Sequence, residues 1–308
     1  MKERLADLGY AAGWRLVRLL PERPAVALFD RIADWTARKG GPAQLRANLK
    51  RVVPQAGEAE MDELVRSSMR SYLRYWREAF RLPSMDLEAV FAELDRSITG
   101  VENLDAALAE GRGAVAALPH SGNWDMAGVW LVGHSGTFTT VAERLKPESL
   151  YRRFIAFRET LGFEVVPLTG GEHNPAVVLA ERLRANRVVC LLADRDLTAG
   201  GVPVTFFGER TMMPAGPAHL AATTGAALLP VGVWFTGSGW TFRIHPPVRV
   251  QGVADVASAT QSLADVFAAD IAAHPADWHM MQPLWLADLP ESRQRALARA
   301  LARREAPE

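Results

Sequence analysis

The chain has 308 residues, of which 49% are hydrophobic and 23% are charged, and its 35 basic side chains balance 35 acidic ones. These proportions are typical of a soluble globular protein with a large core, and the zero net charge argues against a nucleic-acid partner. An excess of basic side chains at 1–81, mainly arginines, instead favours contact with an anionic surface.

The first 83 residues are predicted to be helical and to contact a membrane. Three amphipathic segments, at 8–20, 25–41 and 59–82, end at Pro21, at a Gly-Gly pair and at Pro83. In the third segment aromatic residues alternate with arginines, which suits either a membrane interface or a core-facing helix with solvated arginines. That choice stays open for the third segment, whereas the first two favour interfacial contact.

Membrane contact is expected to be peripheral. No window reaches about 18 uninterrupted apolar residues, so no spanning helix is expected, and the opening residues lack the apolar region of a signal peptide. The lone cysteine, Cys190, lies in an apolar run, which predicts an inert buried thiol in a reducing cytosol.

From about Gly111 short apolar β-prone runs alternate with helical stretches. The expected strands cover 114–119, 137–142, 163–168, 187–193, 202–208, 227–235 and 242–250. Helices are expected at 124–132, 148–161, 176–185, 215–224, 257–272 and 291–305.

This alternation predicts an α/β fold with a central mixed, mostly parallel sheet flanked by helices on both faces. A hairpin whose turn is Gly237–Gly239 supplies the antiparallel pair. The simplest organisation is a single domain over 1–308, with an N-terminal helical cap at 1–83, an α/β core at 84–290 and a C-terminal helix at 291–308.

His120 and Asp125 follow the first expected strand, in the stretch PHSGNWD. The carboxyl ends of strands open into the crevices of α/β sheets, so His120 is well placed for chemistry. Asn123 can cap the next helix and leave backbone N–H groups free to bind an oxyanion. Asp125 can reach back to the imidazole, whose other nitrogen then acts as a base. A structural role stays open, because the helix dipole alone favours aspartate in a first turn.

Several other chemistries lack their motifs. The stretch Gly133–Thr137 departs from a serine nucleophile elbow because Thr137 replaces the last glycine. The sequence has no HExxH motif, no cysteine pair, no phosphate loop and no dinucleotide fingerprint. Neither a metal nor a resident cofactor is therefore expected.

Four stretches, PHSGNWD, TTVAERLKPESLYRRFIAFRE, LLADRDLTAGGVPVTFFGERTMMPAGPAHLA and DWHMMQPLW, resemble the lysophospholipid acyltransferase superfamily. The similarity is to the bacterial lipid A lauroyl/myristoyl acyltransferase branch and, within it, to actinobacterial phosphatidylinositol mannoside acyltransferases. It runs from DLGYAAGWRLVR to WLADL, so it covers nearly the whole chain.

The resemblance implies an enzyme at the cytoplasmic face of the plasma membrane, attached peripherally. Such an enzyme transfers a long acyl chain, typically palmitoyl, from acyl-CoA to a mannose 6-hydroxyl of phosphatidylinositol mono- or dimannoside. Its expected partners are acyl-CoA as a co-substrate, the mannosylated phosphatidylinositol acceptor and an anionic membrane surface. No cofactor and no nucleic acid are implied.

The resemblance also assigns site residues. It makes His120 the general base, supported by Asp125, with Asp194 completing a charge relay or positioning that pair. Because close relatives carry glutamate where this chain has the shorter Asp194, a water or a shifted backbone is expected to bridge the gap. Arg195 and Asp196 are expected to be the ion partners of Asp194.

Four residues are expected to bind substrate. By resemblance, Glu143 and Arg158 line the groove, and Arg144 and Arg195 add guanidinium groups that can hold phosphate oxygens. A purely structural ion pair between Glu143 and Arg158 is the alternative.

The nearby apolar residues suit either an acyl-binding wall or ordinary core; they are Phe206, Phe207, Met212 and Met213. Other functions also stay open: acyl transfer to another glycolipid or lysophospholipid, hydrolysis of thioesters or lipid esters by the same His–Asp pair, and a non-catalytic membrane adaptor.

Overall fold

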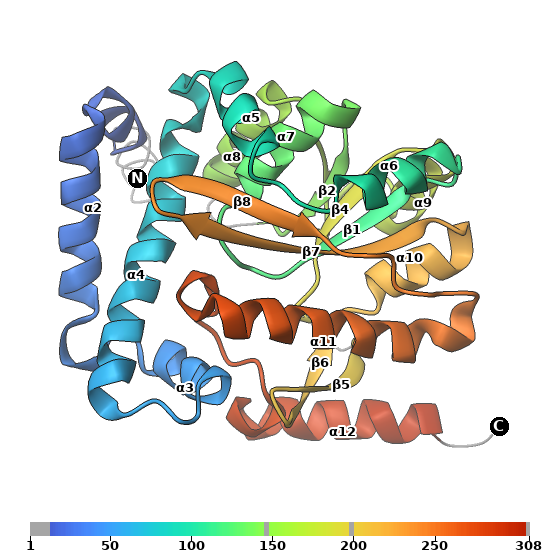
Figure 1. Ribbon diagram of the computed structural model, residues 1–308. Coiled ribbons are helices and arrows are strands. Elements are labelled where there is room, and N and C mark those ends of the chain that lie inside the picture. Colours follow the sequence, from blue (N-terminus) through green and yellow to red (C-terminus); the bar gives the residue numbers. More distant parts are fainter. Residues whose placement is uncertain (1–12, 145–147, 197–199, 306–308) are drawn as a thin grey trace.

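The computed structural model describes residues 13–144, 148–196 and 200–305 (Figure 1). Residues 13–19 are helical, and α2 (Glu22–Thr36), α3 (Ala43–Val52) and α4 (Glu58–Arg81) follow. In Figure 1, α2 runs along the outer side of α4, which separates it from the α/β part. Met61, Val65 and Met69 recur at helical spacing along α4 and are buried with α2 and α3, which explains why these helices associate.

Three short helices were not predicted from the sequence: α3, α5 (Leu87–Asp95) and α6 (Val101–Ala109). The side chain of Asp86 caps α5 by accepting the amides of Glu88 and Ala89. Among the described residues, none of the helices combines the length and the apolar character that crossing a bilayer requires.

The predicted central sheet is confirmed. Its strands are β1 (Ala114–Leu118), β2 (Thr139–Ala142), β3 (Glu164–Pro167), β4 (Val188–Leu192), β7 (Ala227–Thr236) and β8 (Gly239–Ile244), in the order β3-β2-β4-β1-β7-β8. All neighbours are parallel except the β7–β8 hairpin. The strand expected at 242–250 ends at Ile244, because the following Pro246 and Pro247 cannot continue a hydrogen-bonded ladder.

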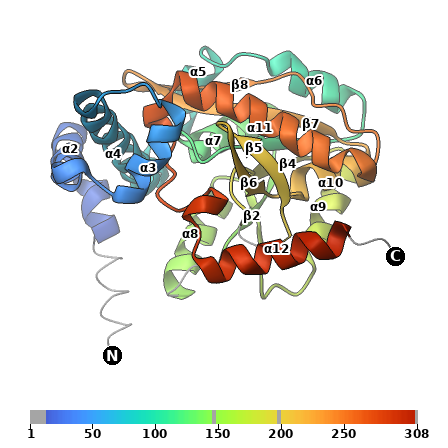
Figure 2. The same ribbon diagram turned by 90° about the horizontal axis from the view of Figure 1, so that it is seen from below.

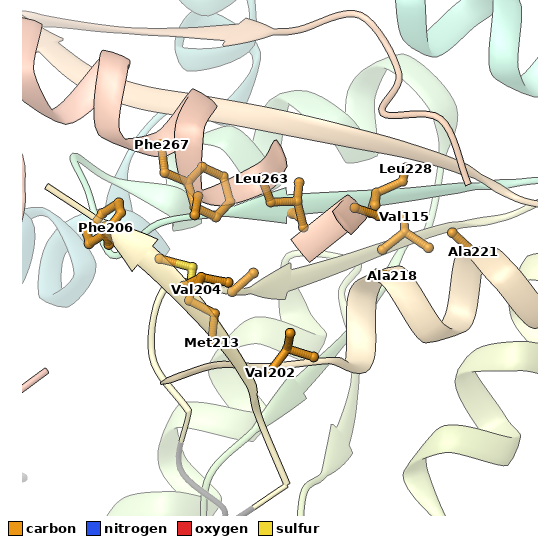
Figure 3. Close-up of a cluster of buried hydrophobic side chains, with 14 of the residues drawn as sticks. Val115, Val202, Val204, Phe206, Met213, Ala218, Ala221, Leu228, Leu263 and Phe267 are labelled. Carbon is orange, nitrogen blue, oxygen red and sulfur yellow. The ribbon is translucent and has the colours of Figure 1, made fainter. Parts of the chain in front are cut away.

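A separate antiparallel ribbon holds the strand expected at 202–208. There β5 (Val202–Phe206) pairs with β6 (Glu209–Met213), which the sequence analysis missed, and the ribbon packs against α11 (Val256–Ala273). Figure 3 shows Phe206, Val204 and Met213 of the ribbon facing Leu263 and Phe267 of α11.

Helices cover both faces of the sheet, as predicted (Figure 1). One face carries α5, α6, α7 (Trp124–Ser135) and α8 (Glu148–Thr160), and the other carries α9 (Pro175–Arg184), α10 (Gly216–Thr224) and α11. Alternate residues of β1 serve the two layers: Ala116 faces α7, and Val115 faces α10 and α11. Seen from below in Figure 2, α2, α3 and α4 stand together beside the α/β part, and α12 (Glu291–Glu305) lies along its edge.

Candidate functional site

The register of two neighbouring parallel strands brings His120 and Asp194 together. Leu118, the last residue of β1, pairs with Leu192, the last residue of β4. His120 and Asp194 each follow two residues later, so the two loops leave the sheet side by side at its carboxyl edge. This is the edge at which α/β sheets form crevices.

Asp194 clamps His120 at two points. Its Oδ1 lies 2.5 Å from Nδ1 of the imidazole, and its Oδ2 accepts the backbone N–H of His120 at 3.0 Å. Oδ2 also accepts the indole N–H of the buried Trp278 at 3.0 Å. Burial opposes ionisation of this carboxyl, but the nearby His120 and these hydrogen bonds outweigh burial and lower the pKa of Asp194.

The clamp decides which ring nitrogen of His120 can act as a base. A carboxylate only accepts hydrogen bonds, so the proton of the neutral ring lies on Nδ1 and the lone pair on Nε2. Among the described residues Nε2 has no hydrogen-bond partner, and the side chain is 31% exposed. His120 is therefore oriented on one side and available to a substrate hydroxyl on the other.

Two expectations for Asp194 are wrong: that a gap separates its carboxylate from His120, and that Arg195 and Asp196 are its ion partners. The carboxylate reaches His120 directly, without a bridging water, because the strand register already places the two loops together. Arg195 lies instead at a small cavity beside α12, next to Arg293. Asp196 accepts the backbone N–H of Gly201 rather than pairing with Asp194.

The expected hydrogen bond from Asp125 to His120 is also wrong. In the first turn of α7, Asp125 faces α4 and α8, where it accepts Nε of Arg158 at 2.9 Å and the hydroxyl of Tyr75 at 3.3 Å. Burial disfavours the charge on Arg158, but Asp125 outweighs burial and raises the pKa of the guanidinium. Asp125 therefore holds Arg158 at the site.

The turn between His120 and α7 depends on Gly122 and Asn123. Gly122 has a φ of +56°, and a Cβ there would lie 2.8 Å from the carbonyl oxygen of Val233. The side chain of Asn123 caps α7 by accepting the amides of Asp125 and Met126, so these two amides are not the free oxyanion donors expected. Of the described amides in the first turn of α7, that of Trp124 has no partner.

A cavity of about 420 Å³ extends from His120 between the sheet and the layer formed by α7 and α8. Its apolar wall includes residues of the sheet and of the helices α7 and α8, among them Ala116, Leu118, Val188, Leu192, Leu229, Val231, Ile244, Trp130, Leu131 and Phe154. Val188 pairs with Ala114 at the far end of β1, so the cavity follows the whole strand, about 13 Å for four residues. This deep apolar space with polar groups at one end suits an alkyl chain with a reactive head.

The four residues considered for an acyl-binding wall are not among the residues that line this cavity. Phe206, Met212 and Met213 are buried, and Phe206 and Met213 pack in the core on the opposite face of the sheet (Figure 3). Phe207 packs partly buried against the same core. The alternative that these residues are ordinary core is therefore correct.

Three of the residues expected to bind substrate, Glu143, Arg144 and Arg158, lie in the stretch TTVAERLKPESLYRRFIAFRE and differ in their surroundings. Glu143 and Arg158 both line the cavity, as expected, but Arg158 pairs with Asp125, so the alternative of a structural Glu143–Arg158 pair is wrong. Arg144 lies at the exposed surface, where it binds Glu148. Cys190 also lines the cavity wall, and burial raises the pKa of its thiol, in line with the expected inert cysteine.

Helix α4 contributes to the site, which the sequence analysis missed. Its aromatic residues Tyr72, Tyr75 and Trp76 line the cavity, so the core-facing interpretation of this helix is the correct one. The accompanying arginines are not all solvated, since Arg74 pairs with the buried Glu78. The sequence signal that could have indicated this role is the presence of polar residues on the same face of the amphipathic helix as its aromatic residues.

His279, which follows Trp278, is the other missed residue at the cavity. Its backbone N–H donates to the carbonyl of His120 at 2.8 Å, and its Nε2 lies 2.9 Å from the hydroxyl of Ser71. Burial, with a smaller contribution from the nearby His120, lowers the pKa of His279 to about 3. His279 is therefore neutral in the folded protein.

The neutral His279 predicts a pH-dependent stability. Between about pH 6.5 and 3 the unfolded chain binds a proton at this residue that the folded chain does not, so stability decreases as pH falls. Between pH 7 and pH 5 the free energy of unfolding should drop by about 2 kcal/mol from this residue alone. Urea unfolding at both pH values measures this decrease in the free energy of unfolding, which should be smaller by about 2 kcal/mol in His279→Gln than in the wild type. Equal decreases in the two proteins would contradict a lowered pKa of His279.

Comparison with known proteins gives consistent matches over nearly the whole chain. The sequence profile of the family described as bacterial lipid A biosynthesis acyltransferase matches residues 3–287. A phosphatidylinositol mannoside acyltransferase of Mycolicibacterium smegmatis is 60% identical over 294 residues, which cover 96% of each chain. A protein with the same name from Mycobacterium tuberculosis H37Rv is 62% identical over 291 residues, which cover 94% of this chain and 92% of the relative.

Proposed function

Since this chain belongs to the bacterial lipid A biosynthesis acyltransferase family and is thus an acyltransferase of glycolipid synthesis, we propose a specific acyl donor and acceptor for it. It transfers a long acyl chain, palmitoyl by preference, from acyl-CoA to a mannose 6-hydroxyl of phosphatidylinositol mono- or dimannoside. The names of the relatives support the mannolipid acceptor. One observation carries the mechanism: Nε2 of His120, which has no hydrogen-bond partner within the part of the chain that the structure describes, lies at the polar end of a deep apolar cavity.

In the proposed reaction, His120 Nε2 removes the proton of the mannose hydroxyl as its oxygen attacks the thioester carbonyl carbon. The electron pair of the carbonyl moves to its oxygen, where the amide of Trp124 can donate to it. The tetrahedral intermediate collapses, the carbon–sulfur bond breaks, and the coenzyme A thiolate takes the proton from Nε2. Asp194 stabilises the imidazolium that forms between the two transfers.

The remaining site residues have matching roles. The acyl chain occupies the apolar cavity, where each buried methylene contributes about 0.8 kcal/mol. Arg158, held by Asp125 at the cavity wall, offers a cation to phosphate oxygens of the donor or the lipid. Acyl-CoA is a co-substrate, and the reaction uses no resident cofactor.

The proposal is tested by incubating the enzyme with palmitoyl-CoA and a panel of acceptors, followed by mass analysis of the products. The panel contains phosphatidylinositol, its mono- and dimannosides and a lysophospholipid. An acylated mannoside supports the proposal, and tandem fragmentation locates the new ester. Release of free palmitate at an equal rate with and without acceptor would instead identify a hydrolase.

The cavity predicts that a bulky residue at Ala116 changes chain-length preference. Ala116 lies on β1 midway along the cavity wall, so the ring of Ala116→Phe would occupy the space of the distal methylenes. We expect kcat/KM for palmitoyl-CoA to fall at least tenfold, while decanoyl-CoA keeps most of its kcat/KM. A parallel loss for both donors would place the acyl chain outside this cavity.

We also propose that the N-terminal helices attach the protein to an anionic membrane at its cytoplasmic face. Leu28, Ile32 and Trp35 recur at helical spacing on α2 and are exposed, Trp35 by 66%, as are Leu16 and Leu19 in the preceding helix. An exposed apolar row of this kind, with basic residues nearby, suits the interfacial region of a bilayer.

The membrane proposal predicts a loss of binding when this row is made polar. Replacing Leu28, Ile32 and Trp35 with serine should weaken cosedimentation with anionic vesicles at least tenfold. Val177→Ser with Val253→Ser serves as the control, because both valines are exposed but lie outside α2. Equal binding by the two variants would contradict membrane contact through α2.

A further inference from the structure

Three polar residues on one face of α4 each hold a different part of the site. Ser71, Tyr75 and Glu78 follow one another at helical spacing, four and three residues apart. Ser71 bonds the imidazole of His279, Tyr75 donates to Asp125, and Glu78 accepts from the side chain of Asn123. The outer helical part therefore contacts the catalytic loop directly.

Glu78 is the most constrained of the three. It is 4% exposed, and its Oε2 accepts the amide N–H of Asn123 at 2.8 Å and the indole N–H of Trp240 at 2.7 Å. Its Oε1 accepts Nε of Arg74 at 2.7 Å and lies 3.5 Å from Arg77. Among the described residues, both oxygens thus face only donors, which a carboxylate satisfies and a carboxamide does not.

Asn123 has two possible amide orientations, and only one caps α7. Its Oδ1 must face the amides of Asp125 and Met126, which leaves its NH2 group to face Glu78. Because Glu78 only accepts hydrogen bonds, it stabilises this orientation against the flipped one. Asn123 lies between His120 and Asp125, so its orientation determines how the loop carries both.

We propose that Glu78 is a positioning residue for acyl transfer, which acts by fixing the capping orientation of Asn123 and thereby the loop that presents His120. The inference rests on the proposed function, because the loop is catalytic only if His120 is the base. A misplacement of about 1 Å in a reacting group can cost about a hundredfold in rate. Glu78 therefore affects turnover more than it affects donor binding in the cavity.

The test compares Glu78→Gln with Trp240→Phe. The single oxygen of the glutamine should stay with the charged Arg74, because charge-assisted hydrogen bonds are the stronger ones. Its NH2 then faces the NH2 of Asn123, which loses the acceptor that enforces its capping orientation. We expect kcat for palmitoyl transfer to fall at least tenfold, with KM for palmitoyl-CoA within twofold of wild type. Trp240→Phe removes another donor to the same oxygen and leaves Asn123 held, so its kcat should stay within twofold.

A double variant that exchanges the carboxylate and the carboxamide between positions 78 and 123 should restore part of the lost turnover. In Glu78→Gln/Asn123→Asp, the new carboxylate caps α7 and accepts from the NH2 of the glutamine. We expect its kcat to be at least threefold above that of Glu78→Gln, with full recovery prevented by the unpaired indole of Trp240. Asn123→Asp alone sets two carboxylates against each other and should lose turnover, which keeps the test available if Glu78→Gln fails to fold.

Hydrogen exchange separates this inference from the proposed function. The peptide covering 120–131 contains the amides of Asp125 and Met126 and should exchange faster in Glu78→Gln than in wild type or Trp240→Phe. Absence of transfer by the wild type would count against the proposed function and leave this readout intact. Unchanged exchange, equal kcat losses in Glu78→Gln and Trp240→Phe, or no recovery in the double variant would overturn the positioning role.

Discussion

Replacing His120 with alanine is expected to lower the rate of acyl transfer by on the order of 10²–10⁴-fold. A sugar hydroxyl is a poor nucleophile until its proton is withdrawn, and Nε2 of the partly exposed His120 is a lone pair at the cavity that has no hydrogen-bond partner among the described residues. The steady-state rate of palmitoyl transfer from palmitoyl-CoA to the mannolipid acceptor measures the loss.

The fold and the donor site should survive this substitution. His120 is partly exposed and lies in a loop, so its removal leaves the two main core clusters intact. Thermal unfolding and the equilibrium binding of palmitoyl-CoA should therefore remain close to wild type. A His120→Ala enzyme with undiminished turnover would refute the role of the imidazole as the base. Loss of palmitoyl-CoA binding would show that His120 acts in donor binding and not in proton transfer.

Asp194→Asn is expected to lower transfer by a comparable factor while keeping the shape of the side chain. The Oδ2 position accepts two N–H groups, from the His120 backbone and from Trp278, so the carboxamide oxygen takes that place. Its NH2 group then faces Nδ1 of His120 and moves the ring proton to Nε2. The base is lost without removing the histidine.

Asp194→Glu provides the matched control, because it keeps the carboxylate and adds one methylene. The longer side chain must shift against the buried Trp278, so some activity is lost, but the tautomer of His120 is preserved. We expect kcat for Asp194→Glu to exceed that of Asp194→Asn by at least tenfold. Similar kcat values for the two variants would show that size, and not charge, matters at this position.

The sequence placed both members of the proposed catalytic pair, His120 and Asp194, but did not reveal their direct contact. Apolar runs followed by His120 and by Asp194 were enough to place each residue at the carboxyl end of a strand. Local pattern carries no information on strand order, however, and it is the adjacency of β1 and β4 that brings the carboxylate to the ring. The shorter aspartate therefore needed no bridging water.

Spacing along the chain misled the prediction for Asp125. Only four residues separate it from His120, but once α7 begins at Trp124 the side chain faces Tyr75 of α4 and Arg158 of α8. These partners are distant in sequence. Composition was equally ambiguous for Phe206 and Met213, because soft apolar residues fit a core and a ligand wall equally well, and only the face of the sheet on which they lie decides between the two.

The pH dependence of the single-turnover rate tests the central claim most directly. With palmitoyl-CoA and mannolipid both saturating, the logarithm of the wild-type transfer rate should fall in acid with a slope of about one, because the imidazole of His120 must be unprotonated. The residual rate of His120→Ala should lack this acid limb. The same limb in the alanine variant would show that another group takes the proton and would contradict the account.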